Sequence, residues 1–243
     1  MRIKAVVAYD GTDYHGFQRQ VSAFEPTIQG QLEAALKRIK QSGTVWGAGR
    51  TDSGVHAAGQ VIAFDVNWSH GLGDLLRALN VVLPNDIAVL ELEQAADHFH
   101  PRFDASSREY QYRIYSTAIR QPLLDRYEWH VPRPLNVDLM NRVAAQLIGE
   151  HDFAAFGQPT AGETTVRNMM RAEVSVSDVH ISIDLQANGF LHRMVRRIVG
   201  TLFKVGCGEI TEVDFAEILA TADLDHVGPV VPANGLCLIR VNY

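Results

Sequence analysis

The pattern of hydrophobic and polar positions predicts elements in the order β-α-β-β-α-β along the first half of the chain. An apolar, β-branched run at 3–8 ends at Asp10-Gly11-Thr12, as a strand followed by a turn does. Behind Thr27, a residue type that caps helices, apolar residues recur at helical spacing from 28 to 39, and Gly43 would end this helix. The remaining predicted elements are strands at 45–46, 60–66 and 87–92 and a helix at 75–82, closed by Pro84. This order is the split βαβ arrangement of ferredoxin-like folds.

The second half repeats this order of elements more loosely. Strands are predicted at 110–115, 172–176, 181–185 and 236–241, and helices at 136–148 and 191–205. Thr211 and Asp214 have the spacing of a capping box, which would open one more short helix.

These patterns together predict an α+β fold of two ferredoxin-like or RRM-like halves with antiparallel sheets. We place the boundary between an N-terminal half, 1–103, and a C-terminal half, 104–243. No long linker rich in Pro, Gly or Ser separates the two in the sequence. We therefore expect the halves to pack together around a cleft, which is a common place for an active site.

The composition is that of a globular protein, with 47% hydrophobic and 21% charged residues among 243. The two cysteines, Cys207 and Cys237, form no CxxC pair and lie near no histidine at ligand spacing, so we expect neither a metal site nor a disulfide. The sequence shows no signal peptide and no run of about 18 apolar residues. We therefore expect a cytoplasmic protein with no membrane-spanning helix.

The formal net charge of −6 argues mildly against nucleic-acid binding, but such binding depends on where the basic groups lie. Of the 22 basic residues, 18 are arginines. Arginine is the better side chain for bidentate contacts with phosphate and for stacking on bases. The charge therefore leaves RNA binding open.

The segment 47–54, Gly-Ala-Gly-Arg-Thr-Asp-Ser-Gly, carries the strongest chemical signal. Its three glycines allow a ligand to approach the backbone closely. A dinucleotide fingerprint would need Gly where Asp52 stands, and a P-loop would need Gly-Lys-Ser/Thr, so neither nucleotide motif fits. Arg50 beside Asp52 favours an ionised carboxylate, which a nucleophile or a base requires. A turn in which Asp52 caps its own backbone explains the spacing equally well.

Two further segments combine aromatic residues with polar or basic ones. The loop at 9–20 mixes aromatics, amides and Arg19, which suits contacts with looped RNA, although a surface hairpin loop would look the same. Strand alternation places Tyr110 and Tyr112 on one face, either as a buried aromatic pair or as a surface on which a base stacks.

The helix predicted at 191–205 carries several basic residues beside its apolar face. Two interpretations remain open for them, a solvated basic face and a stripe that faces phosphates. The residues concerned are His192, Arg193, Arg196 and Arg197.

Together and in this order, these segments resemble the bacterial tRNA pseudouridine synthase A family. The resemblance covers nearly the whole chain, through stretches at 9–11, 16–20, 48–56, 83–88, 99–103, 108–112, 167–168 and 190–200. The block Gly-Arg-Thr-Asp-x-Gly-Val-His at 49–56 is highly specific. It outweighs the interpretation of Asp52 as a turn residue.

The resemblance implies two ferredoxin-like halves whose sheets join across a central active-site cleft, the pseudouridine synthase fold. It implies a homodimer that binds tRNA. Its reaction would be the isomerisation of uridine to pseudouridine at positions 38, 39 and 40 of the anticodon stem-loop, after the target base has flipped out of the stack. We expect no cofactor and no metal, because the reaction involves no redox change and no net hydrolysis.

The resemblance also assigns roles to particular residues. Asp52 matches the nucleophile of the family, and Arg50 matches the arginine beside it that helps to hold the flipped nucleotide. Tyr110 matches the tyrosine that stacks on the uracil, and Arg196 matches the arginine that pairs with the catalytic Asp. Further residues in the matching stretches are expected to contact the substrate, namely Arg19, His56 and Arg102.

The sequence departs from the family at Phe17, where many family members have Trp. Phenylalanine retains an aromatic face at this position.

Two competing classes of protein fit the sequence less well. A non-catalytic RNA-binding module would not explain an Asp among glycines, because the carboxylate would repel phosphate. A hydrolase with Asp52 as nucleophile would need a second acid or metal ligands, and the sequence has none at suitable spacing.

Overall fold

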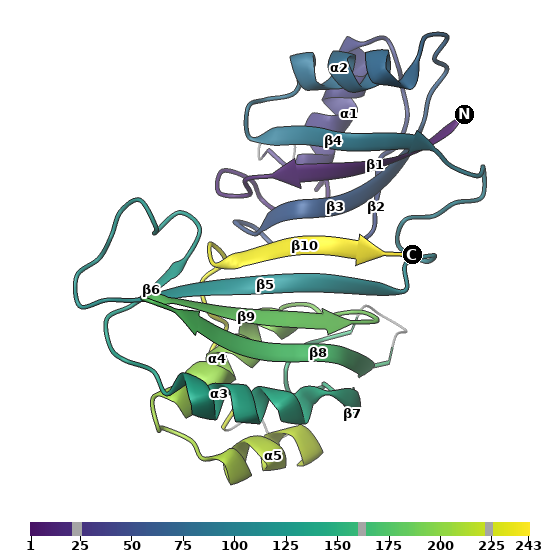
Figure 1. Cartoon of the computed structure of the whole chain (residues 1–243). Helices are drawn as coiled ribbons and strands as arrows, with labels where there is room; N and C mark the ends of the chain where they lie inside the picture. Colours follow the sequence, from purple (N-terminus) through teal and green to yellow (C-terminus); the bar gives the residue numbers. More distant parts are fainter. Residues whose placement is uncertain (21–25, 160–163, 222–225) are drawn as a thin grey trace. The chain divides into compact units, whose positions relative to one another are not determined.

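The computed structural model describes residues 1–20, 26–159, 164–221 and 226–243, and the chain divides into two compact units (Figure 1). Unit 1 comprises Met1–Ser106 with Cys237–Tyr243, and unit 2 comprises Ser107–Leu236. The C-terminal strand therefore belongs to unit 1, whereas the sequence pattern alone had grouped it with the second half. Its backbone pairs in parallel with His56 and Ala57 of unit 1.

Unit 1 is built on a sheet with the strand order β4-β1-β3-β10, in which β2 pairs with β3. The pairing is antiparallel except that β10 runs parallel to β3. The two helices pack against each other, and α2 also packs against β4. The elements are β1 (Arg2–Tyr9), α1 (Ile28–Arg38), β2 (Trp46–Gly47), β3 (His56–Asp65), α2 (Leu72–Val82), β4 (Ile87–Gln94) and β10 (Leu236–Asn242).

The elements of unit 1 follow from local signals in the sequence. In β1 every second residue is buried, which is the alternation that predicted the strand. The predicted cap of α1 is confirmed, since the Thr27 hydroxyl accepts a hydrogen bond from the Gly30 amide at 3.2 Å. The strand β3 begins at His56, four residues earlier than predicted, because Ala57 pairs with Tyr9 of β1.

The end of α1 differs from the prediction. The helix stops at Arg38 and not at Gly43, because Lys40 takes a left-handed conformation with φ of 59°. The amide of Gln41 then donates to the carbonyl of Leu36 at 2.9 Å, and that of Lys40 donates to Lys37 at 3.0 Å. These two bonds form a Schellman motif, with a lysine in the position that glycine usually holds.

Unit 2 is built on an antiparallel sheet with the strand order β5-β9-β8-β7, with β6 parallel to β5. Helix α3 packs against β8 and α4, and α5 contacts both α3 and α4. The elements are β5 (Ser107–Ser116), β6 (Trp129–Val131), α3 (Val137–Ala144) with a 3-10 turn at Ala145–Leu147, β7 (Gly149–Asp152), β8 (Val166–Ser177), β9 (His180–Ala187), α4 (Met194–Gly206) and α5 (Glu212–Thr221).

Helix α4 begins later than its apolar pattern predicts. Arg193 has a φ of 62°, a left-handed conformation that cannot continue a right-handed helix, so the helix starts at Met194. His192 and Arg193 therefore precede α4, and only Arg196 and Arg197 of the predicted basic stripe lie on it.

The sequence pattern predicted one further feature of unit 2 and missed another. The capping box is confirmed, because Thr211 and Asp214 each accept a hydrogen bond from the other's backbone amide, at 3.2 and 2.7 Å. The short strands β6 and β7 were not predicted, since three or four residues are too few to show a period.

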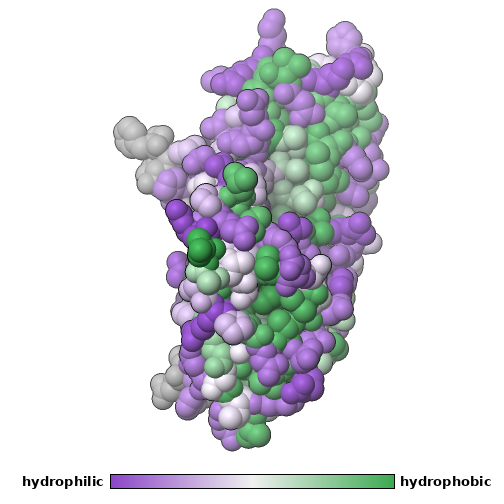
Figure 2. Space-filling model, turned by 60° about the vertical axis from the view of Figure 1, so that its left-hand side comes forward, coloured by the Kyte–Doolittle hydropathy of each residue, from purple (hydrophilic) through white to green (hydrophobic). Residues whose placement is uncertain are grey.

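On the face that Figure 2 shows, hydrophobic residues form patches among hydrophilic ones. Among the largely exposed apolar side chains are Val81, Phe103, Ile119 and Leu123. Within the described parts of the chain, no helix has the length and apolar character needed to cross a membrane.

A close backbone contact holds α4 in unit 2. A Cβ on Gly200 would overlap the carbonyl oxygen of Pro229, so this helix position has no room for a side chain. The neighbouring Thr201 hydroxyl accepts a hydrogen bond from the Gly228 amide at 2.9 Å and donates one to the Arg197 carbonyl at 2.8 Å. The segment 228–229 therefore lies directly on the helix backbone.

We expect Gly200→Ala to lower the free energy of unfolding by about 2 kcal/mol or more, because the methyl group forces two backbones apart. Gly73→Ala in α2 is the matched control, since a Cβ there meets nothing within 4 Å. It should raise stability by up to about 1 kcal/mol through helix propensity. Urea unfolding of both variants tests this contrast, and equal stabilities would contradict the contact described for Gly200.

Candidate active site

Asp52 lies on the loop that joins β2 to β3. These strands pair antiparallel, with Trp46 opposite Ala63, so residues 48–55 form the connection of a hairpin. Along this loop Thr51 is buried, Asp52 is half-buried and Arg50 is exposed. The loop therefore leaves Arg50 and part of Asp52 accessible, two positions apart in the sequence, while Thr51 between them is buried.

Buried polar side chains hold the part of the loop that precedes Asp52. The Thr51 hydroxyl forms a 2.9 Å hydrogen bond with the Tyr9 hydroxyl, which lies at the end of β1. The side-chain amide of Gln60 donates to the Gly49 carbonyl at 3.0 Å and to the Tyr9 hydroxyl at 3.4 Å. The sheet of unit 1 therefore fixes the backbone that carries Asp52.

A second loop braces the first from the side. The carbonyl of Tyr14 accepts hydrogen bonds from the Ser53 hydroxyl at 3.1 Å and the Gly54 amide at 3.3 Å. Gly16 has a φ of 86°, and a Cβ there would lie 2.8 Å from the Thr51 carbonyl oxygen. Only glycine fits this conformation and this approach, which gives Gly16 a role in holding the Asp52 loop.

His56 connects the same two loops from a buried position. Its Nδ1 accepts a hydrogen bond from the Gly11 amide at 3.1 Å and lies 3.1 Å from a carboxylate oxygen of Asp10. The structure thus gives the imidazole a role in the architecture of the site. The contact with substrate expected of His56 stays a prediction.

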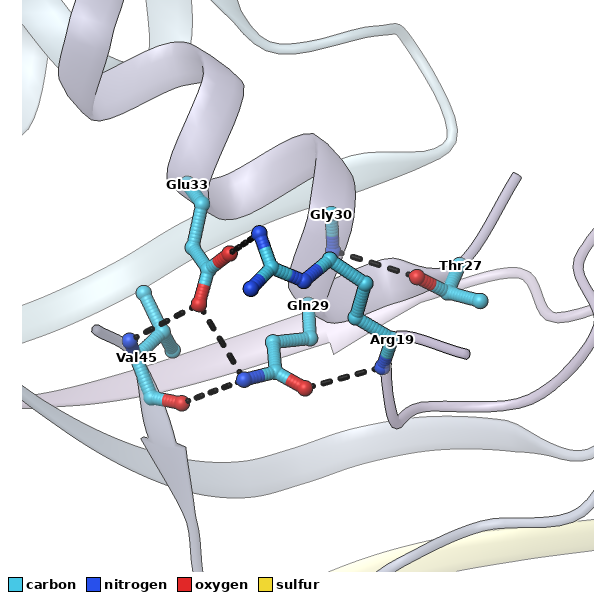
Figure 3. Close-up of polar contacts among 6 residues, drawn as sticks. All are labelled: Arg19, Thr27, Gln29, Gly30, Glu33 and Val45. Carbon is cyan, nitrogen blue, oxygen red and sulfur yellow. Dashed lines mark hydrogen bonds and ion pairs between the residues drawn. The ribbon is translucent and has the colours of Figure 1, made fainter. Parts of the chain in front are cut away.

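Arg19 is fastened to helix α1 (Figure 3). Its amide donates to the Gln29 side chain at 2.8 Å, and its guanidinium lies 3.1 Å from the Glu33 carboxylate. The other Glu33 oxygen accepts from the Gln29 side chain at 3.1 Å and from the Val45 amide at 3.3 Å. Glu33 therefore ties Arg19 to the chain that enters β2, and a phosphate bound by Arg19 would share the guanidinium with Glu33.

Two of the predicted site residues belong to unit 2. Tyr110 on β5 is half-buried, and its ring contacts the Phe190 ring edge-on at 5.1 Å. Arg196 on α4 donates from Nε to the Val231 carbonyl at 2.7 Å. Tyr112 is fully buried, and its hydroxyl donates to the Pro232 carbonyl at 2.9 Å. The interpretation as a buried residue therefore fits Tyr112, whereas Tyr110 keeps part of its ring accessible.

Comparison with known proteins identifies the family of the chain. The model of the family described as tRNA pseudouridine synthase matches residues 5–104 and 143–243. The chain belongs to this family. It is therefore an enzyme that isomerises uridine in tRNA, which favours catalysis over a non-catalytic RNA-binding module or a hydrolase.

Curated relatives agree over the full length of the chain. A tRNA pseudouridine synthase A of Moorella thermoacetica is 43% identical, and one of Thermoanaerobacter sp. (strain X514) is 40% identical, each over 99% of both chains. Among solved structures, an archaeal box H/ACA sRNP Nop10–Cbf5 complex shares 12% identity at a TM-score of 0.39, over 93% of this chain and 60% of that chain. The assignment rests on the family model and the curated relatives.

Sequence reasoning did not single out the residues that anchor the loop of this pseudouridine synthase. A polar residue at the start of an otherwise apolar strand was a signal for Gln60. The aromatic loop at 9–20 includes Tyr9, but nothing in the sequence marked it as an anchor of the Asp52 loop, because the pairing of its hydroxyl with Thr51 joins residues 42 positions apart. Among the described residues, no three His, Cys, Asp or Glu side chains gather as a metal site would require.

Burial raises the pKa of the Tyr9 hydroxyl to about 12, although its hydrogen bonds to Thr51 and Gln60 act in the opposite direction. The folded protein thus favours the neutral phenol, and this contribution to stability is complete below pH 10. It is lost as the pH rises from the ordinary pKa of 10 to about 12.

We expect Tyr9→Phe to destabilise the protein by about 1 kcal/mol below pH 10, because it leaves the buried Thr51 hydroxyl without this partner. Above pH 10 the difference in unfolding free energy between wild type and variant should shrink, since the variant has no phenol to ionise there. Denaturant unfolding at pH 8, 10 and 11.5 measures this difference. A constant difference at all three values would contradict the burial of Tyr9.

Proposed function

We propose that this enzyme converts uridine to pseudouridine at positions 38, 39 and 40 of the tRNA anticodon stem-loop, with Asp52 as the catalytic carboxylate. The observation that carries this proposal is the fixed backbone around Asp52. Neighbouring residues on both sides are held by buried hydrogen bonds, at Gly49, Thr51 and Gly54, while Asp52 itself remains half-exposed. A reacting group needs such positioning, since small displacements cost large factors in rate.

The reaction breaks the C–N glycosidic bond, turns the uracil, and forms a C–C bond at the same sugar carbon. In one route the Asp52 carboxylate attacks the nucleotide and forms a covalent intermediate. In the other it removes a proton from the sugar, so that the uracil leaves and a glycal forms. Both routes need an ionised carboxylate, and both return Asp52 to its starting state when the new C–C bond forms and the uracil C5 proton is released.

The target base must leave the helical stack before a side chain can reach it, at a cost of a few kcal/mol. We propose that Arg50, which is exposed beside Asp52, holds the flipped nucleotide. Tyr110 stacks on the uracil, and Arg196 pairs with the catalytic carboxylate. Further contacts with the RNA are assigned to Arg19, His56 and Arg102.

We also propose that the enzyme acts in the cytoplasm as a homodimer. The resemblance to the bacterial family supports both statements. Ile119 and Leu123, which lie largely exposed on the segment between β5 and β6, offer apolar surface that a second copy would cover.

Asp52→Asn keeps the shape of the side chain and removes its charge. We expect cells that lack the gene to lose pseudouridine at positions 38 to 40, and the wild-type chain to restore it. The Asn variant should restore none, because its activity falls by on the order of a thousandfold or more. Mapping of pseudouridine in cellular tRNA measures both outcomes.

The matched control is Asp138→Asn, the same exchange at an exposed position of α3. This variant should restore the modification fully. Binding of tRNA by the Asp52→Asn protein would show that the loss is chemical and not a failure to fold. Unchanged anticodon arms in the deletion strain would overturn the positions proposed, and an active Asn variant would overturn the role of Asp52.

Substitutions at Tyr110 distinguish a stacking role of its ring from a chemical role of its hydroxyl. We expect Tyr110→Ala to raise KM by about 10-fold, because base–aromatic stacking contributes roughly 1–3 kcal/mol. Tyr110→Phe keeps the ring and its contact with Phe190, so its KM should equal that of the wild type. The measurement is tritium release from tRNA labelled at uracil C5, and a raised KM in Tyr110→Phe would contradict a stacking role.

A further inference from the structure

A short turn that follows β4 presents an aromatic ring to solvent. Phe103 is 73% exposed, although the neighbouring Pro101 is buried. A single exposed apolar side chain is common on protein surfaces and needs no explanation by itself. The surroundings of Phe103 distinguish it from such a case.

Hydrogen bonds within the turn hold the backbone beneath Phe103. The His100 amide donates to the Asp104 carboxylate at 2.9 Å, and the Asp104 amide donates back to the His100 carbonyl at 3.1 Å. The Arg102 amide donates to His100 Nδ1 at 3.1 Å. The Tyr243 hydroxyl, at the C-terminus, donates to the Pro101 carbonyl at 2.8 Å. The ring is therefore displayed on a fixed turn.

Two groups flank the ring with a chemistry that suits RNA. The His100 ring lies 4.4 Å from the Phe103 ring, centroid to centroid, and the guanidinium carbon of Arg102 lies 5.6 Å from the centroid of Phe103. A flat aromatic face beside a cation is the combination with which proteins hold unpaired nucleotides, since the base stacks and the phosphate meets the cation.

We propose that Phe103 is a stacking platform for an unpaired base of the tRNA substrate, with Arg102 beside it to contact the adjoining phosphate. This inference rests on the tRNA substrate of the family and adds a contact outside the Asp52 loop and Tyr110. Phe103 has no hydrogen-bonding group, so the platform accepts any base. Its ring has few rotatable bonds and sits on a fixed turn, so little conformational freedom is lost when a base stacks.

Substitutions at Phe103 test whether a flat ring is needed. Phe103→Ala and Phe103→Leu should each raise KM for tRNA by about 10-fold with kcat unchanged. Phe103→Tyr and Phe103→Trp should keep the wild-type KM, because they keep a stacking face. The Leu variant separates stacking from general hydrophobicity. Val81→Ala in α2 is the matched control, since Val81 is 82% exposed and lies on a helix away from this turn in the sequence.

The salt dependence of tRNA binding distinguishes the role of Arg102 from that of Phe103. Arg102→Gln should reduce the slope of log affinity against log salt concentration by about one, which corresponds to one phosphate contact. Phe103→Ala should leave this slope unchanged, because stacking releases no counterion. Equal slopes for wild type and Arg102→Gln would overturn the phosphate contact.

A spectroscopic signal reports the stacking directly. Saturating tRNA transcript should quench the additional emission of Phe103→Trp, measured as a difference from the wild type with its own three tryptophans. Emission added by Val81→Trp should not change. An unchanged KM in Phe103→Ala, or an unquenched Trp at 103, would overturn the platform and leave tRNA isomerisation by Asp52 intact. A change of oligomeric state in Phe103→Ala would instead assign the ring to a contact between copies of the chain, which also overturns it.

Discussion

The hydrogen bond between the hydroxyls of Tyr9 and Thr51 is the contact through which the sheet of unit 1 holds the Asp52 loop. It is buried, so neither hydroxyl can exchange its partner for water without cost, and loss of one partner leaves the other desolvated. Gln60 adds a bond to the Gly49 carbonyl, earlier in the same loop. The backbone that carries Asp52 is thereby held by side chains of β1 and β3.

The two loops of the site depend on glycine for a related reason. Gly16 brings the backbone of one loop against Thr51 of the other, at a distance that a side chain would prevent. Close backbone packing lets Tyr14 accept hydrogen bonds from Ser53 and Gly54 through its carbonyl. The glycines that first suggested ligand binding thus also serve the contact between two loops.

Electrostatics explain how an acidic chain remains compatible with an RNA substrate. Several surface arginines are already paired with carboxylates, among them Arg19 with Glu33, Arg120 with Asp125, Arg133 with Glu209 and Arg171 with Glu173. Such exposed pairs contribute only about 0–1 kcal/mol each to stability. Each of these carboxylates cancels one basic charge in the total, so the net charge of −6 does not describe the local charge of any one surface.

The sequence by itself determined the features that depend on neighbouring residues. The alternation in β1, the Thr27 cap of α1 and the capping box at Thr211 are local, and the structure confirms them. The motif around Asp52 is local as well, and it identified the family before any contact was known. Tertiary structure decided what depends on residues far apart. The strands β6 and β7 exist through their pairing, α4 begins where Arg193 turns left-handed, and β10 joins β3 across most of the chain. The anchoring of Asp52 by Tyr9 and Gln60 belongs to the same class, because hydrogen bonds between distant residues leave no period or spacing in the sequence.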